Sequence, residues 1–243
     1  MTTTHSGGDI IGAHTLQVIA KADHFNEWLY EQIRPELHGK IIEIGSGIGN
    51  ISQFLVRDGY DISLSDLDEG YLEALVKKFG QNPRVERILP IDLVAADFTS
   101  RYALLEGRYE TVFLLNVLEH IEDDHRAISN THFLLKPGGQ VIVLTPAYPW
   151  LYCRYDKELG HFRRYTRHHL SAVVRAGGFQ PVHARYFNFL GIPGWLLLGK
   201  ILRHKNLEAG EVSLFNKLVP LGRWLDKLVF RRMGLSVIVT GKK

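Results

Sequence analysis

Closely spaced glycines near residue 45 form the part of the sequence best suited to holding a ligand. Gly45, Gly47 and Gly49 follow four mostly β-branched residues, 41–44, that are typical of a short buried strand. Glycine lets the backbone turn sharply and approach a ligand without an intervening side chain. A helical pattern begins near Asn50 or Ser52, and the first turn of a helix offers unpaired N–H groups to polar ligands. The residues therefore predict a cofactor-binding turn between a strand and a helix.

An aspartate stands where a nucleotide-binding site needs an acid. Asp66 comes 21 residues after Gly45 and ends a second predicted strand, 60–66. A carboxylate at this point can accept hydrogen bonds from both hydroxyls of a ribose. Asp68 is the neighbouring alternative, although its position suits the N-cap of the next helix. We therefore assign the ribose contact to Asp66.

The glycine spacing distinguishes two kinds of nucleotide cofactor. The dinucleotide fingerprint G-x-G-x-x-G requires its third glycine where this chain has Asn50. The chain instead reads E-x-G-x-G-x-G, which resembles the first motif of class I S-adenosylmethionine-dependent methyltransferases. In that family the turn contacts the methionine end of the cofactor. The resemblance therefore implies cofactor contacts from Glu43, Gly45, Ser46, Gly47 and Gly49.

Further segments resemble the same family, in the family's order along the chain. Residues 116–121 read N-V-L-E-H-I, and residues 135–139 read L-K-P-G-G before an apolar strand. A dinucleotide site explains neither segment, so the chain is identified as a member of this methyltransferase class. The family places an acid on the adenine amino group, which fits Asp92, with Asp97 as the competing position. The other implied cofactor contacts are Leu67, Leu93 and Asn116.

Two histidines could take part in proton transfer. His120 lies in N-V-L-E-H-I, and a structural or positioning role is favoured for it over that of a general base. His161 belongs to G-H-x-R-R-Y-T, which resembles a bacterial methyltransferase subgroup acting on small molecules or lipid-linked metabolites. Its imidazole could remove the proton of an acceptor hydroxyl or acidic carbon. Nothing in the spacing calls for a metal ion, because the adjacent His168 and His169 cannot face one site on a helix.

The loop after the fifth strand, residues 146–165, is rich in aromatic and basic side chains. Methyl transfer is an in-line displacement, so the enzyme mainly has to align the acceptor with the methyl carbon. Arginine suits bidentate binding of carboxylate or phosphate. We expect substrate contacts from Tyr148, Tyr152, Arg163, Arg164 and Tyr165. The alternative is that the arginines pair with Asp156 or Glu158 and only brace the loop.

Helices and strands that alternate along the chain must position these residues. They predict an α/β fold: one three-layer, Rossmann-like sheet of about seven strands, the last antiparallel beside the fifth, with helices on both faces. Residues 1–243 form one domain, with a helical lid at 1–40, a cofactor half at 41–145 and a substrate-recognition part at 146–243. The predicted strands are 41–44, 60–66, 85–90, 110–115, 140–145, 179–187 and 235–241, and Lys136–Gly139 is expected to stop the preceding helix.

The predicted lid helix, residues 10–37, has an unusual density of aromatic residues. In many class I methyltransferases such a helix folds over the cofactor, which would make Trp28 a cofactor contact. Packing of Phe25 and Trp28 against the core is the equally weighted alternative.

Composition fits a folded domain of ordinary polarity. The 243 residues are 45% hydrophobic and 23% charged. The single cysteine, Cys153, excludes an intramolecular disulfide and makes a cysteine-based zinc site implausible. No basic segment followed by an apolar run opens the sequence, so we expect no signal peptide and a cytoplasmic protein.

The last quarter of the chain is basic and apolar. Residues 187–243 carry 10 Lys/Arg against 3 Asp/Glu, a net charge of +7, whereas the preceding residues have a net charge of −4. Residues 189–202 are apolar but too short and too interrupted to span a bilayer, and leucines recur at helical spacing over 214–228. Such a segment suits peripheral contact at the inner face of a membrane, the roof of an apolar pocket, a sheet edge or a homodimer face.

The leading hypothesis is methyl transfer from S-adenosylmethionine, with S-adenosylhomocysteine as product, to a small acceptor that is anionic or has an apolar tail. The competing hypothesis is a membrane-surface or partner-binding protein with a vestigial cofactor fold. Nucleic acid is not an expected substrate, because the N/D-P-P-Y/F motif of many base-modifying methyltransferases is absent and the cofactor half is acidic.

Overall fold

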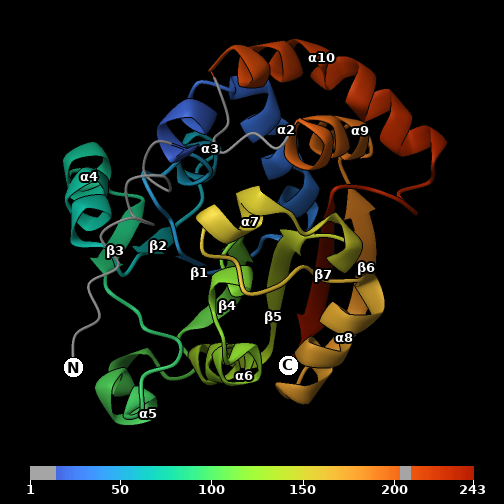
Figure 1. Ribbon diagram of the computed structural model, residues 1–243. Coiled ribbons are helices and arrows are strands. Elements are labelled where there is room, and N and C mark those ends of the chain that lie inside the picture. Colours follow the sequence, from blue (N-terminus) through green and yellow to red (C-terminus); the bar gives the residue numbers. More distant parts are fainter. Residues whose placement is uncertain (1–14, 203–208) are drawn as a thin grey trace.

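A mixed sheet of seven strands runs through the computed structural model, which describes residues 15–202 and 209–243 (Figure 1). The strand order is β3-β2-β1-β4-β5-β7-β6. Neighbours among β1 to β5 pair in parallel, and β7 is antiparallel to both β5 and β6. The strands are β1 (Ile41–Ile44), β2 (Ile62–Ser65), β3 (Val85–Leu89), β4 (Tyr109–Leu115), β5 (Leu135–Pro146), β6 (Gln180–Phe187) and β7 (Ser236–Lys242). The predicted α/β fold and its antiparallel last strand are confirmed.

Helices cover both faces of the sheet and give the molecule three layers (Figure 1). The helices are α2 (Asp23–Ile33), α3 (Ser52–Arg57), α4 (Glu69–Phe79), α5 (Phe98–Arg101), α6 (Asp124–Leu134), α7 (Arg154–Glu158), α8 (Arg167–Ala176), α9 (Gly191–Trp195) and α10 (Ala209–Leu228). Alternate residues of the central strands enter two cores. Ile41 and Phe113 pack with α2, α3, α4 and α10, whereas Ile42 and Val112 pack with α5, α6 and α8. Burial on both faces explains why the central strands β1, β4 and β5 are rich in apolar residues.

The N-terminal helical segment is divided in two. Residues 15–20 are helical, the chain turns at Lys21 and Ala22, and α2 begins at Asp23. The helix ends in the short 3₁₀ turn η1 (Arg34–Glu36), which contains the proline that the sequence marks as a stop. Residues 1–14, where the predicted lid begins, lie outside the described residues.

The fifth strand begins earlier than predicted. Leu135 already pairs with Tyr109, whereas the next paired positions are Gln140 and Thr111, so residues 136–139 bulge out of the ladder. Gly138 adopts φ +77°, a conformation that glycine accepts without steric strain. The helix does end next to the predicted stop at Lys136–Gly139, at Leu134, but these four residues belong to a bulged strand.

The described part of the chain between β6 and β7 is mostly helical, and its helix α10 packs against α2. It contains α9, the π-helical segment η5 (Leu196–Ile201) and α10. A Cβ atom on Gly222 of α10 would lie 2.9 Å from the Trp28 ring of α2, so the glycine allows the two helices to approach closely. Asp226 accepts hydrogen bonds from the backbone N–H groups of Asn188 (2.9 Å) and Phe189 (2.7 Å), where β6 ends. Across the described residues, the apolar runs of the helices are too short to cross a membrane.

Candidate cofactor and acceptor site

The glycine turn has the backbone shape that only glycine adopts easily. Gly45, Gly47 and Gly49 have φ values of +73°, +54° and +76°. A Cβ atom on Gly45 would overlap Val117, and one on Gly49 would overlap Phe79. Gly47 differs, because a Cβ atom added there would lie nearest to the flexible Leu16 side chain, at 3.2 Å. Two of the glycines are therefore fixed by packing, whereas Gly47 is buried beneath the side chain of Leu16.

Asp66 ties the end of β2 to this turn. Its carboxylate accepts hydrogen bonds from the N–H groups of Gly47 (2.8 Å), Leu67 (2.8 Å) and Asp68 (3.1 Å). Burial raises the pKa of Asp66, and the three N–H groups act in the opposite direction. Asp68 has the capping role that its position indicates, since it accepts the Tyr71 N–H bond at the start of α4. The two neighbouring acids thus have separate tasks.

Glu43 supports the turn from inside the protein. Its side chain is only 3% exposed and accepts a hydrogen bond from the Ser52 hydroxyl, at the first residue of α3. The Glu43 carbonyl accepts the Ser65 hydroxyl at 3.1 Å and the Ser46 hydroxyl at 3.4 Å. Burial raises the pKa of the Glu43 carboxyl to about 8. Glu43 therefore braces the strand-to-helix turn.

Asp92 and Leu93 follow β3 in a compact local turn. The Asp92 carboxylate accepts the Val94 N–H bond at 2.9 Å, and the Asp92 N–H group donates to the Tyr102 hydroxyl at 2.9 Å. Leu93 is buried in the core that contains α5 and α6. The competing acid, Asp97, instead pairs with Arg101 on the surface, 3.5 Å away.

Asn116 directly follows β4 in a left-handed conformation, with φ +55°. Asparagine tolerates this conformation better than most residues do. Its N–H group donates to the Leu144 carbonyl of β5 at 2.9 Å, and its side chain is exposed. Because β1, β2 and β4 are parallel neighbours, the glycine turn, Asp66 and Asn116 lie at one edge of the sheet. The fold therefore brings together predicted cofactor residues that lie far apart in the sequence.

A cluster of three polar side chains lies just beyond Asn116. Glu119 and His120 belong to the 3₁₀ turn η3 (Leu118–His120), and His161 comes from the loop after α7. One nitrogen or oxygen atom from each residue lies within 4.8 Å of the others. The imidazoles of His120 and His161 meet edge to face, with ring centroids 4.6 Å apart. We call these three residues the Glu119–His120–His161 cluster.

Glu119 was not among the predicted site residues. Its side chain is 0% exposed, and neither carboxylate oxygen has a hydrogen-bond partner among the described residues. Burial raises its pKa to about 8. Part of His120 is exposed, but burial of the rest and the neighbouring His161 lower the pKa of His120 to about 4. The adjacent Glu and His in the N-V-L-E-H-I segment were the only sequence signal for this cluster.

A buried ion-pair network orients His161. The Asp156 carboxylate, 0% exposed, accepts hydrogen bonds from His161 Nδ1 (2.9 Å), Arg164 Nε (2.7 Å) and the Cys153 N–H group (2.9 Å). Burial opposes ionisation of Asp156, but the bonds from His161 and Arg164 outweigh it and hold the pKa of this carboxyl below its ordinary value. Arg164 therefore pairs with Asp156, which is the predicted alternative to a substrate contact.

The other basic and aromatic residues of the loop have internal partners. The Arg164 guanidinium also donates to the Ala147 carbonyl (3.2 Å) and lies 4.4 Å from the Trp195 ring centroid. The buried Tyr165 hydroxyl donates to Asp124 at 2.7 Å, and Arg163 pairs with the same carboxylate at 2.9 Å. The two contacts with Asp124 fasten the loop to the start of α6.

Tyr148 and Tyr152 keep part of their surface exposed. The Tyr148 ring stacks on Tyr186 with centroids 5.0 Å apart, and its backbone has φ +63°. The Tyr152 hydroxyl donates to the His161 carbonyl at 2.7 Å. Tyr152 is therefore the predicted substrate residue most directly joined to the Glu119–His120–His161 cluster.

The side chain of Trp28, on α2, packs against α10. It is 3% exposed, its ring centroid is 4.6 Å from that of Phe187, and Gly222 packs against it. Its placement matches the core-packing alternative. The glycine turn is instead covered by Leu16, whose carbonyl accepts a bond of 3.3 Å from Asn50. Thus Leu16, rather than Trp28, contacts the turn.

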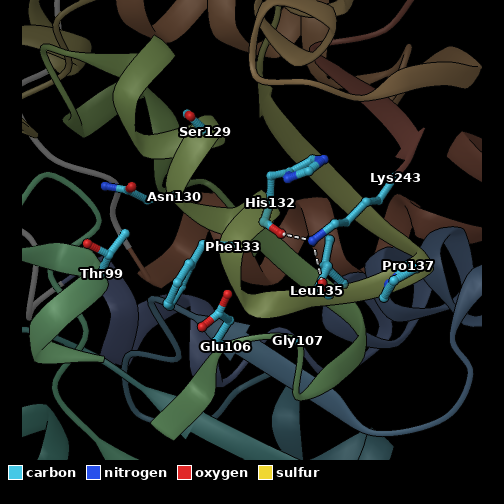
Figure 2. A pocket seen from close by; sticks show the side chains of 10 residues that line it. All are labelled: Thr99, Glu106, Gly107, Ser129, Asn130, His132, Phe133, Leu135, Pro137 and Lys243. Carbon is cyan, nitrogen blue, oxygen red and sulfur yellow. Dashed lines mark hydrogen bonds between the residues drawn. The ribbon is translucent and has the colours of Figure 1, made fainter. Parts of the chain in front are cut away.

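A separate hollow of about 490 Å³ opens at the opposite edge of the sheet, where β5 begins (Figure 2). Figure 2 shows Lys243 reaching the carbonyls of His132 and Leu135, both at 2.7 Å. A lysine ammonium at a helix C-terminus satisfies carbonyls that have no partner within the helix. The arrangement explains Lys243 as a cap for α6, and the hollow is distinct from the glycine turn.

Comparison with known proteins adds a family match. Residues 19–184 match the model of a family described as methyltransferase domain. The chain is 31% identical over 119 residues to the ubiquinone biosynthesis O-methyltransferase of Azotobacter vinelandii, covering 49% of this chain and 48% of the relative. It is 22% identical over 204 residues to the demethylmenaquinone methyltransferase of Clavibacter sepedonicus, covering 79% and 78%. The chain spans about half the length, or less, of the first curated relatives that it matches.

Solved structures share the fold at low sequence identity. A phosphoethanolamine N-methyltransferase of Haemonchus contortus in complex with S-adenosyl-L-methionine has a TM-score of 0.60 and 15% identity, covering 90% of this chain and 52% of that one. A SAM-dependent methyltransferase from Archaeoglobus fulgidus has a TM-score of 0.58 and 15% identity, covering 90% and 94%.

Proposed function

The chain belongs to the family of methyltransferase domains, and we propose that it transfers a methyl group from S-adenosylmethionine to a small-molecule acceptor. The observation that carries the proposal is the joining of the glycine turn to Asp66 at the carboxyl edge of the parallel strands. In an open α/β sheet this edge is where ligands bind. S-adenosylhomocysteine is the expected product.

The residues at this edge fit S-adenosylmethionine. The left-handed glycines carry no side chain, so the backbone of the turn can approach a ligand closely, as a close-fitting cofactor cradle requires. The residues that would hold the cofactor are Gly45, Ser46, Gly47, Gly49, Asp66, Leu67, Asp92, Leu93 and Asn116. Leu67, which is 60% exposed, offers an apolar surface next to the ribose-binding acid. When bound, the cofactor supplies a sulfonium methyl group that a nucleophile can displace in line.

Glu43 and Trp28 act indirectly in this proposal. Glu43 is buried beneath the turn and fixes its shape through Ser52. Trp28 packs α2 against α10, and residues 15–20 take the place of the lid over Gly47. In this proposal the lid over the turn is the helical segment of residues 15–20.

The acceptor side is proposed to be the Glu119–His120–His161 cluster with Tyr148 and Tyr152. The cluster follows Asn116 directly, so an acceptor there would lie beside the methionine end of the cofactor. Arg164 and Tyr165 are proposed to position the loop, because their side chains are buried against internal partners. Arg163 is half-exposed, and it remains the candidate for an anionic group on the acceptor.

The acceptor is proposed to be a small metabolite, anionic or with an apolar tail, and not a nucleic acid. Relatives that match part of the chain carry the names ubiquinone biosynthesis O-methyltransferase and demethylmenaquinone methyltransferase. Both names refer to acceptors related to quinones, which supports a lipid-linked or apolar acceptor for this chain. The atom that receives the methyl group is left to experiment.

The first experiment is mass spectrometry of the small molecules released when the purified full-length protein is denatured. Recovery of S-adenosylmethionine or S-adenosylhomocysteine is the expected result, followed by an acceptor screen with a labelled methyl group. A protein that releases neither compound, and whose melting temperature neither compound changes, would contradict the proposal.

A second candidate function, contact with an anionic membrane surface, is favoured by α10. Val219, Gly222 and Asp226 face inward, whereas one stripe of the helix is apolar and exposed. The exposed apolar residues are Leu214, Leu218, Leu221, Trp224 and Leu228. Lys217 lies within this stripe and Lys227 beside it, both exposed, and the net charge of +7 over 187–243 complements anionic lipid.

Vesicle co-sedimentation tests this second function. The full-length protein is expected to bind vesicles containing anionic lipid and to lose binding when Leu218 and Leu221 are both replaced by Glu. If the protein binds only neutral vesicles, or binds neither neutral nor anionic vesicles, the proposed contact with an anionic membrane is excluded. Lipid binding by a protein that binds no S-adenosylmethionine would instead favour a vestigial cofactor fold.

A further inference from the structure

We infer that Glu119, His120 and His161 form a binding site for one divalent transition-metal ion on the acceptor side of the molecule. The three side chains come from two segments, the turn η3 and the loop after α7. One potential ligand atom of each lies within 4.8 Å of the others. A single ion at their centre can therefore be reached by small side-chain adjustments.

The donor set has the chemistry of a transition-metal site. Two imidazoles and one carboxylate suit Zn²⁺, Fe²⁺, Co²⁺, Ni²⁺ and Mn²⁺, whereas Mg²⁺ and Ca²⁺ favour oxygen ligands alone. Three protein ligands leave at least one coordination position for an outside molecule. Catalytic metal sites keep such an open position, and closed structural sites do not.

Glu119 gives an independent indication of a missing ligand. Its side chain is 0% exposed, and both carboxylate oxygens lack a hydrogen-bond partner among the described residues. Buried polar groups in proteins are nearly always paired, so an orphan carboxylate requires an explanation. The closest cationic side chain in the same network, Arg164, is engaged by Asp156 and Ala147. A metal ion would supply the partner that the surrounding side chains do not.

His161 is held as metal-binding histidines usually are. Its Nδ1 lies 2.9 Å from the Asp156 carboxylate, so Nδ1 carries the proton and Nε2 keeps its lone pair for an ion. Asp156 is itself fixed by Arg164 and by the Cys153 N–H group. This carboxylate–histidine arrangement sets both the tautomer and the ring orientation before any ion arrives.

The backbone fixes the two segments against each other. The Phe162 N–H group, next to His161, donates to the Glu119 carbonyl at 2.8 Å. Arg163 donates to the Glu122 carbonyl at 2.8 Å, one turn further along. The loop is thus fastened at the two residues that follow His161, which makes the cluster preformed.

The position of the ion indicates the chemical class of the acceptor, an inference that rests on the proposed function. The cluster begins three residues after Asn116, which directly follows β4 at the cofactor edge. An ion there would face the acceptor and could bind one of its oxygens in the open position. The acceptor class is therefore a compound that presents a hydroxyl or carboxylate oxygen.

The test is a titration of full-length protein freed of metal by chelator and dialysis. Co²⁺ is the probe, followed by visible absorption and by calorimetry, with Zn²⁺ as competitor. Binding of one ion per chain, displaced by Zn²⁺, is expected. Glu119→Gln and His161→Gln should each weaken Co²⁺ binding at least about tenfold, as loss of groups that hold a metal does. The exposed His168→Gln on α8 is the matched control and should leave binding unchanged.

Two results would overturn the site. One is the absence of stoichiometric binding to the wild-type protein, and the other is equal affinity in the wild-type, Glu119→Gln and His161→Gln proteins. Far-ultraviolet circular dichroism verifies that each variant is folded. If His161→Gln does not fold, the near-isosteric Glu119→Gln still provides the test. Calorimetry with S-adenosylmethionine on the same samples separates the two proposals, because ion binding without cofactor binding supports the metal site and contradicts the methyltransferase function.

Discussion

The Gly47 N–H group donates a 2.8 Å hydrogen bond to the Asp66 carboxylate, across 19 residues of sequence. The bond joins the turn that is proposed to hold the methionine end of the cofactor to the acid proposed for its ribose. The two halves of the cofactor site therefore share one side chain, and a change at Asp66 should affect both.

The first prediction concerns the two neighbouring acids. Asp66→Ala removes a charged acceptor that serves three N–H groups, so affinity for S-adenosylmethionine should fall at least about tenfold by calorimetry. Asp68→Ala is the matched control: it removes the α4 cap, should cost about 1 kcal/mol of stability and should leave cofactor affinity unchanged. Equal losses of affinity in both variants would contradict the assignment of the ribose contact to Asp66.

The second prediction compares two glycines with the same backbone conformation. Gly47 and Gly107 both have φ +54°, so replacement by Ala should cost each about 1 kcal/mol in urea unfolding. Gly107 lies in the hollow at the opposite edge, with nothing within 4 Å of an added Cβ atom (Figure 2). Only Gly47→Ala should weaken S-adenosylmethionine binding. Weakening by Gly107→Ala as well would mean that the effect is one of general stability.

The third prediction is a pH dependence caused by Glu43. In the folded protein burial raises the pKa of this carboxyl to about 8, whereas the unfolded chain should ionise it near its ordinary value. Between these two pKa values the folded state binds more protons. The free energy of unfolding should therefore fall as pH rises, by up to about 1.4 kcal/mol per pH unit from this group.

The variant Glu43→Gln keeps a polar partner for Ser52 but cannot ionise. Urea unfolding from about pH 5 to about pH 8 should give a shallower decline for the variant than for the wild type. Parallel curves would show that Glu43 is already ionised in the folded protein.

The fourth prediction concerns the buried network beside His161. Asp156→Asn leaves the Arg164 guanidinium, whose side chain is 1% exposed, without its counter-charge. Removing one partner of a buried pair costs about 3–5 kcal/mol. Glu158→Gln breaks the exposed Arg154–Glu158 pair on the same helix and should cost about 0.3–0.5 kcal/mol. Comparable unfolding midpoints for the two variants would refute the structural importance assigned to Asp156.

The sequence was sufficient for features that depend on short stretches of chain. The strand at 41–44, the left-handed glycines after it and the acid at the end of β2 all follow from local pattern. Parallel topology then brings strand ends to one edge, so Asp66 and Asn116 could be placed together without knowing any side-chain contact.

Features that depend on how one loop docks were not predictable. Glu119 meets His161 because the Phe162 N–H group bonds to the Glu119 carbonyl, a contact that no spacing rule encodes. For the same reason the sequence left open whether Arg164 binds substrate or Asp156. Trp28 could face the cofactor or the core from its helical position alone, and only the packing of α10 decides between them.

The small-to-large contact between Gly222 and Trp28 has an evolutionary consequence. Unlike the glycines of the cofactor turn, Gly222 has an ordinary helical backbone, so only the indole ring 2.9 Å from an added Cβ atom excludes a larger residue. In relatives that retain α10, a smaller side chain at position 28 should accompany alanine or serine at position 222. Covariation of positions 28 and 222 would show that the close approach of α2 and α10 is maintained among relatives.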